Sequence, residues 1–153
     1  MSEDLKVVAN NRRARKNYEI INTYEAGVVL LGSEVKSLRL GNATLKDSYA
    51  TIRDGEVWLH NLHIGPYPAA GKYHQHDPER VRKLLLKRRE IDRVFGRQIE
   101  KGLTLVPLRI YFRNGRAKVE IAVARGRKSY DKRDVLKRQA VERDVEQAMR
   151  RRR

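Results

Sequence analysis

The chain has 153 residues and no cysteine, so neither a disulfide nor a thiolate metal site can stabilise it. This length predicts one domain with a core large enough to fold without such help. Lysine and arginine number 35 against 19 acidic residues, and the formal net charge of +16 predicts a polyanionic partner: nucleic acid, an anionic membrane or an acidic protein. The alternative is a basic protein without such a partner.

The apolar stretches are short, as at 28–31 and 84–86, whereas a membrane-spanning helix needs roughly 20 residues. The N-terminus also lacks the apolar run of a signal peptide. Together with the absence of cysteine, these features lead us to expect a cytoplasmic protein without a membrane segment.

The first 16 residues are polar and basic, and we interpret them as an arm that leads into the fold. Strand signals begin at Tyr18, because 18–24 is rich in aromatic and β-branched residues and 28–31 continues the apolar content. A short helix is predicted next, with Ser33 as its N-cap and Gly41 ending it in a left-handed conformation.

Two hairpins give stronger signals. Segments 49–53 and 56–62 flank Asp54-Gly55, and segments 106–112 and 116–123 flank Asn114-Gly115. Both dipeptides suit a type I′ turn, which needs positive φ at two consecutive residues. In the second hairpin, period-two alternation predicts that Leu108, Ile110 and Phe112 share one face.

Between the hairpins we predict helix. Asp77-Pro78 is typical of an N-cap followed by a first-turn proline, and apolar residues at 81, 84, 85, 91, 94 and 95 have helical spacing. The body is therefore predicted to be mainly β with flanking helices, as a small antiparallel barrel with about three helices. A sandwich with appended helices is the alternative.

The tail, 131–153, has nine basic and five acidic residues and no aromatic, glycine or proline. Its apolar stripe is narrow and an isolated helix of this length is marginal in water, so we predict disorder in the free chain and helix when bound. We expect two parts, 1–130 as an RNA-binding body and 131–153 as the tail.

Catalytic motifs are missing: the sequence contains no GxSxG, phosphate loop or Rossmann glycine pattern. His74-Gln75-His76 beside Asp77 is the one group resembling metal ligands, and without cysteine or HExxH spacing we expect no metal, cofactor or small-molecule substrate. Basic clusters at 12–16, 36–39, 80–93 and 125–133 instead favour nucleic acid. The 80–93 cluster has two interpretations, RNA contact or a solvated helix face.

Several motifs together resemble the SmpB family: NRRARKNY at 11–18, EAG at 25–27, EVKSLR at 34–39, HIGPY at 63–67, HDP at 76–78, RKLLL at 82–86, GRK at 126–128 and YDKR at 130–133. The resemblance implies an oligonucleotide-binding-type β-barrel that binds the tRNA-like domain of tmRNA (SsrA RNA), mimics the missing anticodon arm and delivers tmRNA to stalled bacterial ribosomes. It also implies that the tail enters the empty message channel beside small-subunit rRNA. We expect a monomer, one per tmRNA.

The same resemblance assigns residues to two surfaces. The tmRNA-facing surface would contain Asn11, Tyr18, Glu25, Lys36, Arg39 and Lys118, to which the basic clusters add Arg13 and Arg125. The ribosomal decoding region would be faced by Arg127, Lys128, Tyr130, Asp131, Lys132 and Arg133, and the tail cations are Lys137, Arg138, Arg143 and Arg150. Glu25 would accept hydrogen bonds from bases or position a nearby cation, unless it is only a turn residue. A general ribosomal or structured-RNA-binding protein is the alternative function, and an RNA-processing enzyme is a third.

Overall fold

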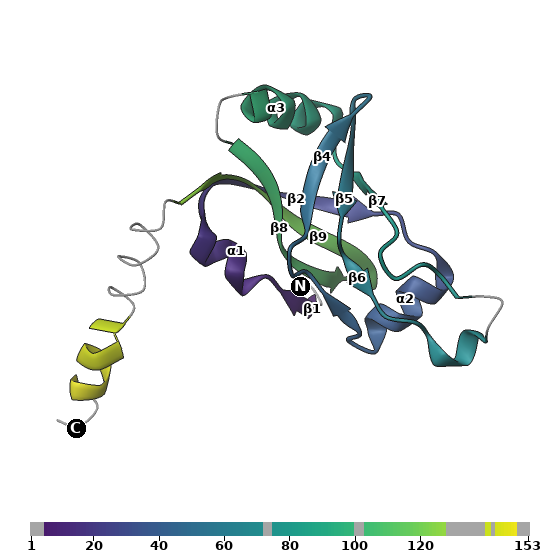
Figure 1. Cartoon of the computed structure of the whole chain (residues 1–153), viewed down its shortest axis with the longest axis horizontal. Helices are drawn as coiled ribbons and strands as arrows, with labels where there is room; N and C mark the ends of the chain where they lie inside the picture. The colour runs from purple at the N-terminus through teal and green to yellow at the C-terminus, as the bar shows by residue number, and fades with distance from the viewer. Residues whose placement is uncertain (1–4, 72–74, 100–102, 128–139, 142, 150–153) are drawn as a thin grey trace.

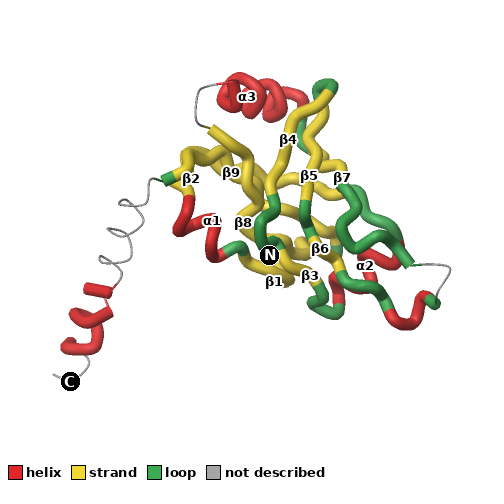
Figure 2. The backbone as a smooth tube through the Cα atoms, viewed as in Figure 1, coloured by secondary structure: helices red, strands yellow, loops and turns green. Residues whose placement is uncertain are grey.

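The computed structural model describes residues 5–71, 75–99, 103–127, 140–141 and 143–149 (Figure 1). Strands make up most of the body, and helical segments lie around them (Figure 2). The elements are β1 (Leu5–Asn10), α1 (Arg12–Asn17), β2 (Tyr18–Val28), α2 (Gly32–Arg39), β3 (Ala43–Thr44), β4 (Tyr49–Arg53), β5 (Glu56–His60), β6 (His63–Ile64), the 3-10 turn η1 (Pro68–Ala70), β7 (Arg82–Leu85), α3 (Arg88–Ile99), β8 (Leu103–Arg113) and β9 (Arg116–Gly126).

The main sheet closes on itself. Its strand order is β1-β8-β4-β5-β7-β2-β9. Strand β8 also pairs with β9, the last strand in this order, so the strands from β8 to β9 form a closed ring. All the pairings in this ring are antiparallel. This arrangement confirms the predicted antiparallel barrel, with β1 added outside the ring along β8.

Both predicted hairpin turns are confirmed. Asp54 and Gly55 have φ of 54° and 74°, and Asn114 and Gly115 have φ of 51° and 80°. Positive φ at two consecutive residues is the type I′ signature, whose twist matches that of the flanking strands. These turns fix the register of β4 with β5 and of β8 with β9.

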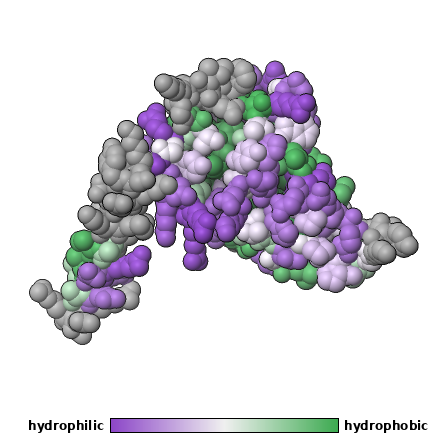
Figure 3. All heavy atoms as spheres, in the orientation of Figure 1, coloured by the Kyte–Doolittle hydropathy of each residue, from purple (hydrophilic) through white to green (hydrophobic). Residues whose placement is uncertain are grey.

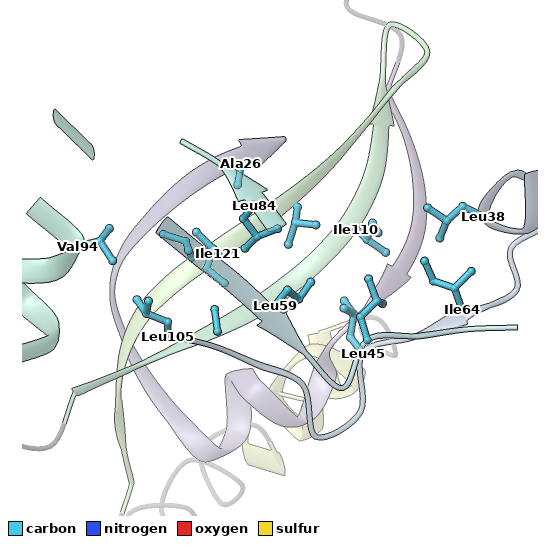
Figure 4. Packing of buried hydrophobic residues seen from close by; sticks show 14 of the residues in the cluster. Ala26, Leu38, Leu45, Leu59, Ile64, Leu84, Val94, Leu105, Ile110 and Ile121 are labelled. Carbon is cyan, nitrogen blue, oxygen red and sulfur yellow. The ribbon is translucent and has the colours of Figure 1, made fainter. Parts of the chain in front are cut away.

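The interior of the barrel is apolar. Side chains from β2, β5, β7, β8 and β9 converge there, and Figure 4 labels Ala26, Leu59, Leu84, Ile110 and Ile121 among them. The prediction that Leu108 shares this face with Ile110 is wrong, because the β8–β9 register shifts between Pro107 and Arg109. The bulge turns Leu108 to a second cluster under α1.

The segment from 82 to 85 is a strand, so the helix predicted there is wrong. Arg82 and Leu84 are both buried and alternate with more exposed neighbours, and β7 pairs with β5 and β2. Asp77 accepts a hydrogen bond from the Glu79 amide in a turn and caps no helix. Helix begins only at Arg88. A short apolar run fits the residue spacing of a helix or of a strand, and here the pairing with β5 and β2 makes it a strand.

The N-terminal segment is folded from Leu5 on, which corrects the prediction of an arm for the residues that the structure describes. β1 pairs with β8, and α1 follows directly. Asn11 joins the two: its Oδ1 accepts from the Ala14 amide and its Nδ2 donates to the Pro107 carbonyl at 2.9 Å. Ser33 is likewise not a cap, because α2 begins at Gly32.

Part of the tail is helical. Residues 140–141 and 143–149 have helical conformation, and their side chains are exposed, including those of Val141, Val145 and Met149. This helix does not test the prediction that the tail is disordered in the free chain and helical when bound. Its coupling to binding stays a prediction.

Candidate nucleic-acid interface

The outer face of the barrel carries alternating charges on β2, β8 and β9. Interior residues such as Ile110, Val119 and Ile121 point inward, so their neighbours along each strand point outward. The register sets Tyr111 opposite Lys118, Arg109 opposite Glu120, and Glu25 opposite Glu120. Two of the predicted RNA-binding residues, Glu25 and Lys118, are thus brought onto one face.

Glu25 organises its neighbours on this face. Its Oε2 accepts from the Tyr111 hydroxyl at 2.5 Å and from Arg113 Nε at 2.9 Å. Burial, and then the hydrogen bond to Glu25, raise the pKa of the Tyr111 hydroxyl above its ordinary value. Arg109 and Arg113 lie over the Tyr111 ring, with guanidinium carbons 4.7 and 5.6 Å from its centroid. Glu25 therefore positions a cation, one of the two roles expected for it.

Glu120 connects the sheet to α1. Its carboxylate lies 3.3 Å from Arg109 Nη2 and 3.5 Å from Arg15 Nη2. The two acidic residues of this face thus hold arginines in defined positions. Fixed guanidinium groups suit the bidentate recognition of phosphate.

A groove adjoins Lys118 at the end of the barrel. It has a volume of about 390 Å³, and its lining includes Gly27, Leu85, Phe112 and Arg116 beside Lys118. Leu85 is 51% exposed although it is a large apolar residue. The exposure of Leu85 was not predicted, because the helix predicted there included Leu85 among its apolar positions. Period-two alternation with the buried Leu84 is the signal that could have found it.

Asn11, a predicted RNA contact, forms hydrogen bonds inside the fold, and its contact with RNA stays a prediction. It is buried, and its amide is occupied by the cap and the Pro107 carbonyl. Arg13, Tyr18 and Tyr49 line a cleft of about 310 Å³ between α1 and the barrel, and Asn11 lines it too. Asn11 is therefore part of this cleft, while its side-chain amide is hydrogen-bonded within the fold.

α2 carries Lys36 and Arg39 and is anchored by buried charges. Glu34 is fully buried and accepts from Arg80 Nη2 at 2.6 Å, from Arg82 Nε at 2.5 Å and from the Leu31 amide at 2.7 Å. Burial by itself raises the pKa of Glu34, but the hydrogen bonds from Arg80, Leu31 and Arg82 lower it more, so this pKa lies below its ordinary value. Lys36 Nζ lies 5.6 Å from the centre of the Tyr67 ring, and Arg39 is exposed.

The basic run from 80 to 93 does not form one face, so neither of its two interpretations holds for the whole segment. Arg82 is fully buried and also donates to the Leu62 and Pro78 carbonyls, and Lys83 pairs with Glu56 at 2.8 Å. Lys87, Arg88, Arg89 and Arg93 are exposed. The later part of the run therefore presents its cations to solvent more fully than Arg80 and Lys83 do.

His76 is held by the fold. Its ring is buried, with Nδ1 at 2.9 Å from Ser33 Oγ and Nε2 at 2.9 Å from the Ile64 carbonyl oxygen. A carbonyl oxygen can only accept, so Nε2 carries a proton and Nδ1 faces the Ser33 hydroxyl. Within the described residues no group of histidine and acidic side chains could hold a metal ion; His74 lies outside them.

The model of the SmpB protein family matches residues 8–151. The chain belongs to this family. It is 56% identical over 146 residues to an SsrA-binding protein of Gloeothece citriformis, which covers 95% of this chain and 94% of that one. It is 54% identical over 147 residues to an SsrA-binding protein of Geobacillus thermodenitrificans, covering 96% and 94%.

A solved structure is also similar. It is described as "tmRNA-SmpB: a journey to the center of the bacterial ribosome", and its chain matches with a TM-score of 0.66 and 54% sequence identity. The match covers 78% of this chain and 84% of that one. The family and the fold were both predicted from the sequence, and both are confirmed.

The remaining predicted contacts lie at the C-terminal end. Arg125 is exposed at the end of β9, and the Arg127 amide donates to the Asn17 carbonyl at 2.8 Å, which sets this end beside α1. Arg143 is exposed on the tail helix. Among the residues that the structure describes, no helix has the length and apolar character needed to span a membrane. The other predicted contacts fall outside the described residues: Lys128, Tyr130, Asp131, Lys132, Arg133, Lys137, Arg138 and Arg150.

Proposed function

We propose that this chain binds tmRNA and accompanies it to stalled bacterial ribosomes. Relatives that are more than half identical over nearly the whole chain are SsrA-binding proteins, and the similar solved structure concerns tmRNA and SmpB on the ribosome. The observation that carries the proposal is the ordered cationic face of β8 and β9, where Glu25 and Glu120 hold arginines beside Lys118.

The face has distinct parts for distinct contacts. Lys118 and the arginines neutralise phosphates, which supplies affinity and salt dependence without sequence preference. The groove at Leu85 offers an apolar wall where a ribose or an unpaired base can pack, since folded RNA is recognised through shape and splayed bases. Asn11 contributes by holding α1 against β8.

The two parts of the chain have separate roles in this proposal. Residues 1–130 bind the tRNA-like domain and stand in for an anticodon arm, and residues 131–153 enter the empty message channel. The residues from Arg127 to Arg133 then face the decoding region. The chain acts in the cytoplasm, as a monomer and without catalysis.

Removal of 131–153 tests this division. The truncated protein should bind tmRNA within about twofold of the full chain, because the outer face is intact, yet it should fail to support peptide tagging on stalled ribosomes. The matched control is a triple alanine substitution of Lys87, Arg89 and Arg93, which removes exposed cations elsewhere and should leave tagging intact. Tagging at full rate by the truncated protein would exclude the two-part mechanism.

A general structured-RNA-binding protein is the competing function, because net charge favours it equally. Glu25→Ala separates the two. It makes the chain more positive, so binding that depends only on charge should be unchanged or tighter. Binding that depends on the position of Arg113 should weaken, and tmRNA affinity measured against a tRNA competitor reports the difference.

A further inference from the structure

Gln75, near α2, is a polar residue to which the proposed function gives no role. It is exposed, yet its side-chain amide makes two hydrogen bonds to the backbone of Tyr67, eight residues earlier. Gln75 Oε1 accepts from the Tyr67 amide at 3.1 Å, and Gln75 Nε2 donates to the Tyr67 carbonyl at 2.6 Å. Both backbone groups of Tyr67 are thus satisfied by one side chain, which holds Tyr67 in place.

The next residue, His76, fixes Gln75 relative to the barrel. The buried His76 ring contacts Ser33 in the first turn of α2 and the Ile64 carbonyl in β6, each at 2.9 Å. Ser37, four residues after Ser33 and therefore on the same side of the helix, donates to the carbonyl that follows Ile64 at 2.6 Å. These contacts join α2, β6 and the backbone at His76 into one fixed unit.

The Tyr67 ring lies against Lys36, one of the residues assigned to the tmRNA-facing surface. Lys36 Nζ is 5.6 Å from the centroid of this ring, which is within the range of a cation–π contact. Lys36 is exposed, and Glu34, the carboxylate of the same helix, pairs with arginines. The ring therefore restrains the ammonium group and leaves its positive charge in place.

The surroundings of Lys36 make this restraint useful. Figure 1 shows α2 at the end of the molecule away from α3, and Figure 3 shows mainly hydrophilic side chains on the visible surface of that end. Lysine is among the side chains that lose most rotamer freedom when they become ordered. A contact that orders Lys36 beforehand therefore lowers the entropy that is lost when a ligand binds it.

We propose that Gln75 is a positioning residue for tmRNA binding, which holds the Lys36 ammonium through the Tyr67 ring so that it meets a phosphate of the RNA. This inference rests on the proposed function and deepens it. Gln75 is neutral, so attraction between charges alone gives it no role in binding. Positioning instead predicts that Gln75 matters only while Lys36 is present.

A double-mutant cycle on the full-length protein tests this dependence through dissociation constants for tmRNA. Gln75→Ala should weaken tmRNA binding about threefold, the size expected when an exposed cation–π contact is lost. Lys36→Ala should weaken binding and lower its salt slope by about 1, because a phosphate contact is removed. In the Lys36→Ala background, Gln75→Ala should change the affinity by less than about 1.5-fold, since the two residues act as a unit.

Two sets of control variants separate positioning from a general loss of structure. Arg39 is an exposed cation on the same helix, and in the Arg39→Ala background the loss caused by Gln75→Ala should remain about threefold. Tyr67→Phe keeps the ring and should bind tmRNA like the parent chain, whereas Tyr67→Leu should match Gln75→Ala. Thermal unfolding of each variant shows whether it is folded.

A second readout needs no RNA. Reductive methylation with isotope-labelled formaldehyde gives each lysine an NMR signal, and Lys36→Ala identifies the signal of Lys36. This signal should move in Tyr67→Leu and in Gln75→Ala, because the ring is removed in one variant and released in the other. If the parent chain did not prefer tmRNA to tRNA, the proposed function would fail, but this movement would still support the positioning of Lys36.

Three results would overturn the inference. The first is tmRNA binding by a folded Gln75→Ala variant that equals that of the parent chain. The second is a loss from Gln75→Ala that persists at full size in the Lys36→Ala background, as expected of a residue with a merely structural role. The third is a Lys36 signal that stays unchanged in Gln75→Ala.

Discussion

Glu34→Gln is the substitution that most directly tests how the fold positions its basic residues. Glu34 and Arg82 are both fully buried, and Glu34 accepts from Arg80, Arg82 and the Leu31 amide. Removing one partner of a buried ion pair leaves an uncompensated charge and costs about 3–5 kcal/mol. Domains of this kind are stable by about 5–15 kcal/mol in total, so the loss is a large fraction.

Thermal and urea unfolding measure this loss. For a domain of this size about 1 kcal/mol shifts the midpoint by about 2–4 °C, so Glu34→Gln should unfold about 6–20 °C lower. Glu56→Gln is the matched control, because it removes the same charge from the half-exposed pair with Lys83 and should cost less than about 1 kcal/mol. The double variant Glu34→Gln/Arg82→Met also removes the Arg82 charge that Glu34→Gln alone leaves without its partner, so it should recover part of the lost stability.

The same pair predicts a pH dependence. The pKa of Glu34 is lower in the folded chain than in the unfolded one, so its contribution to stability is present above the ordinary pKa of 4.5 and is lost as pH falls through the folded pKa. The acid side of the stability profile should therefore be flatter in Glu34→Gln. If that variant unfolds within about 1 kcal/mol of the parent at neutral pH, the anchoring role of Glu34 is wrong.

Three further predictions address other parts of the site. Asn11→Ala should lose about 2–3 kcal/mol in urea unfolding, from the α1 cap and the Pro107 carbonyl; a loss under about 0.5 kcal/mol would contradict that role. The raised pKa of Tyr111 predicts that stability falls as pH rises above its ordinary value of 10.0, and Tyr111→Phe should remove that slope in alkaline denaturation. Lys118→Ala should reduce the salt slope of tmRNA binding by about 1, and an unchanged slope would exclude a phosphate contact there.

The hairpins and the barrel could be predicted because their signals are local. Asn114-Gly115 specifies its turn through backbone conformation alone, and alternation specifies the face of each strand. The bulge at Pro107 and the strand at Arg82–Leu85 could not, since both depend on which distant strand pairs with them. The apolar residues between 81 and 85 are compatible with a helix and with a strand.

Some residues of the candidate site could likewise be predicted from the sequence, and others could not. Lys118 and Glu25 were assigned from the resemblance to the family, and the structure places both on the outward face of their strands. Asn11 has the residue type of an RNA contact, but its burial as a cap depends on the β1–β8 pairing, which sequence does not show. The exposure of Leu85 was not predicted, because it follows from the alternation of side chains along β7 and cannot be inferred from hydrophobicity.

The central claim, that the chain recognises tmRNA and not RNA in general, is tested most directly by the RNA that co-purifies with it from cells. The tagged full-length protein is recovered and the bound RNA is sequenced against total RNA, with Lys118→Ala recovered in parallel. The account predicts strong enrichment of tmRNA with the parent chain and a clear reduction with the variant. Recovery of tmRNA only in proportion to its abundance, beside tRNA and ribosomal RNA, would contradict it.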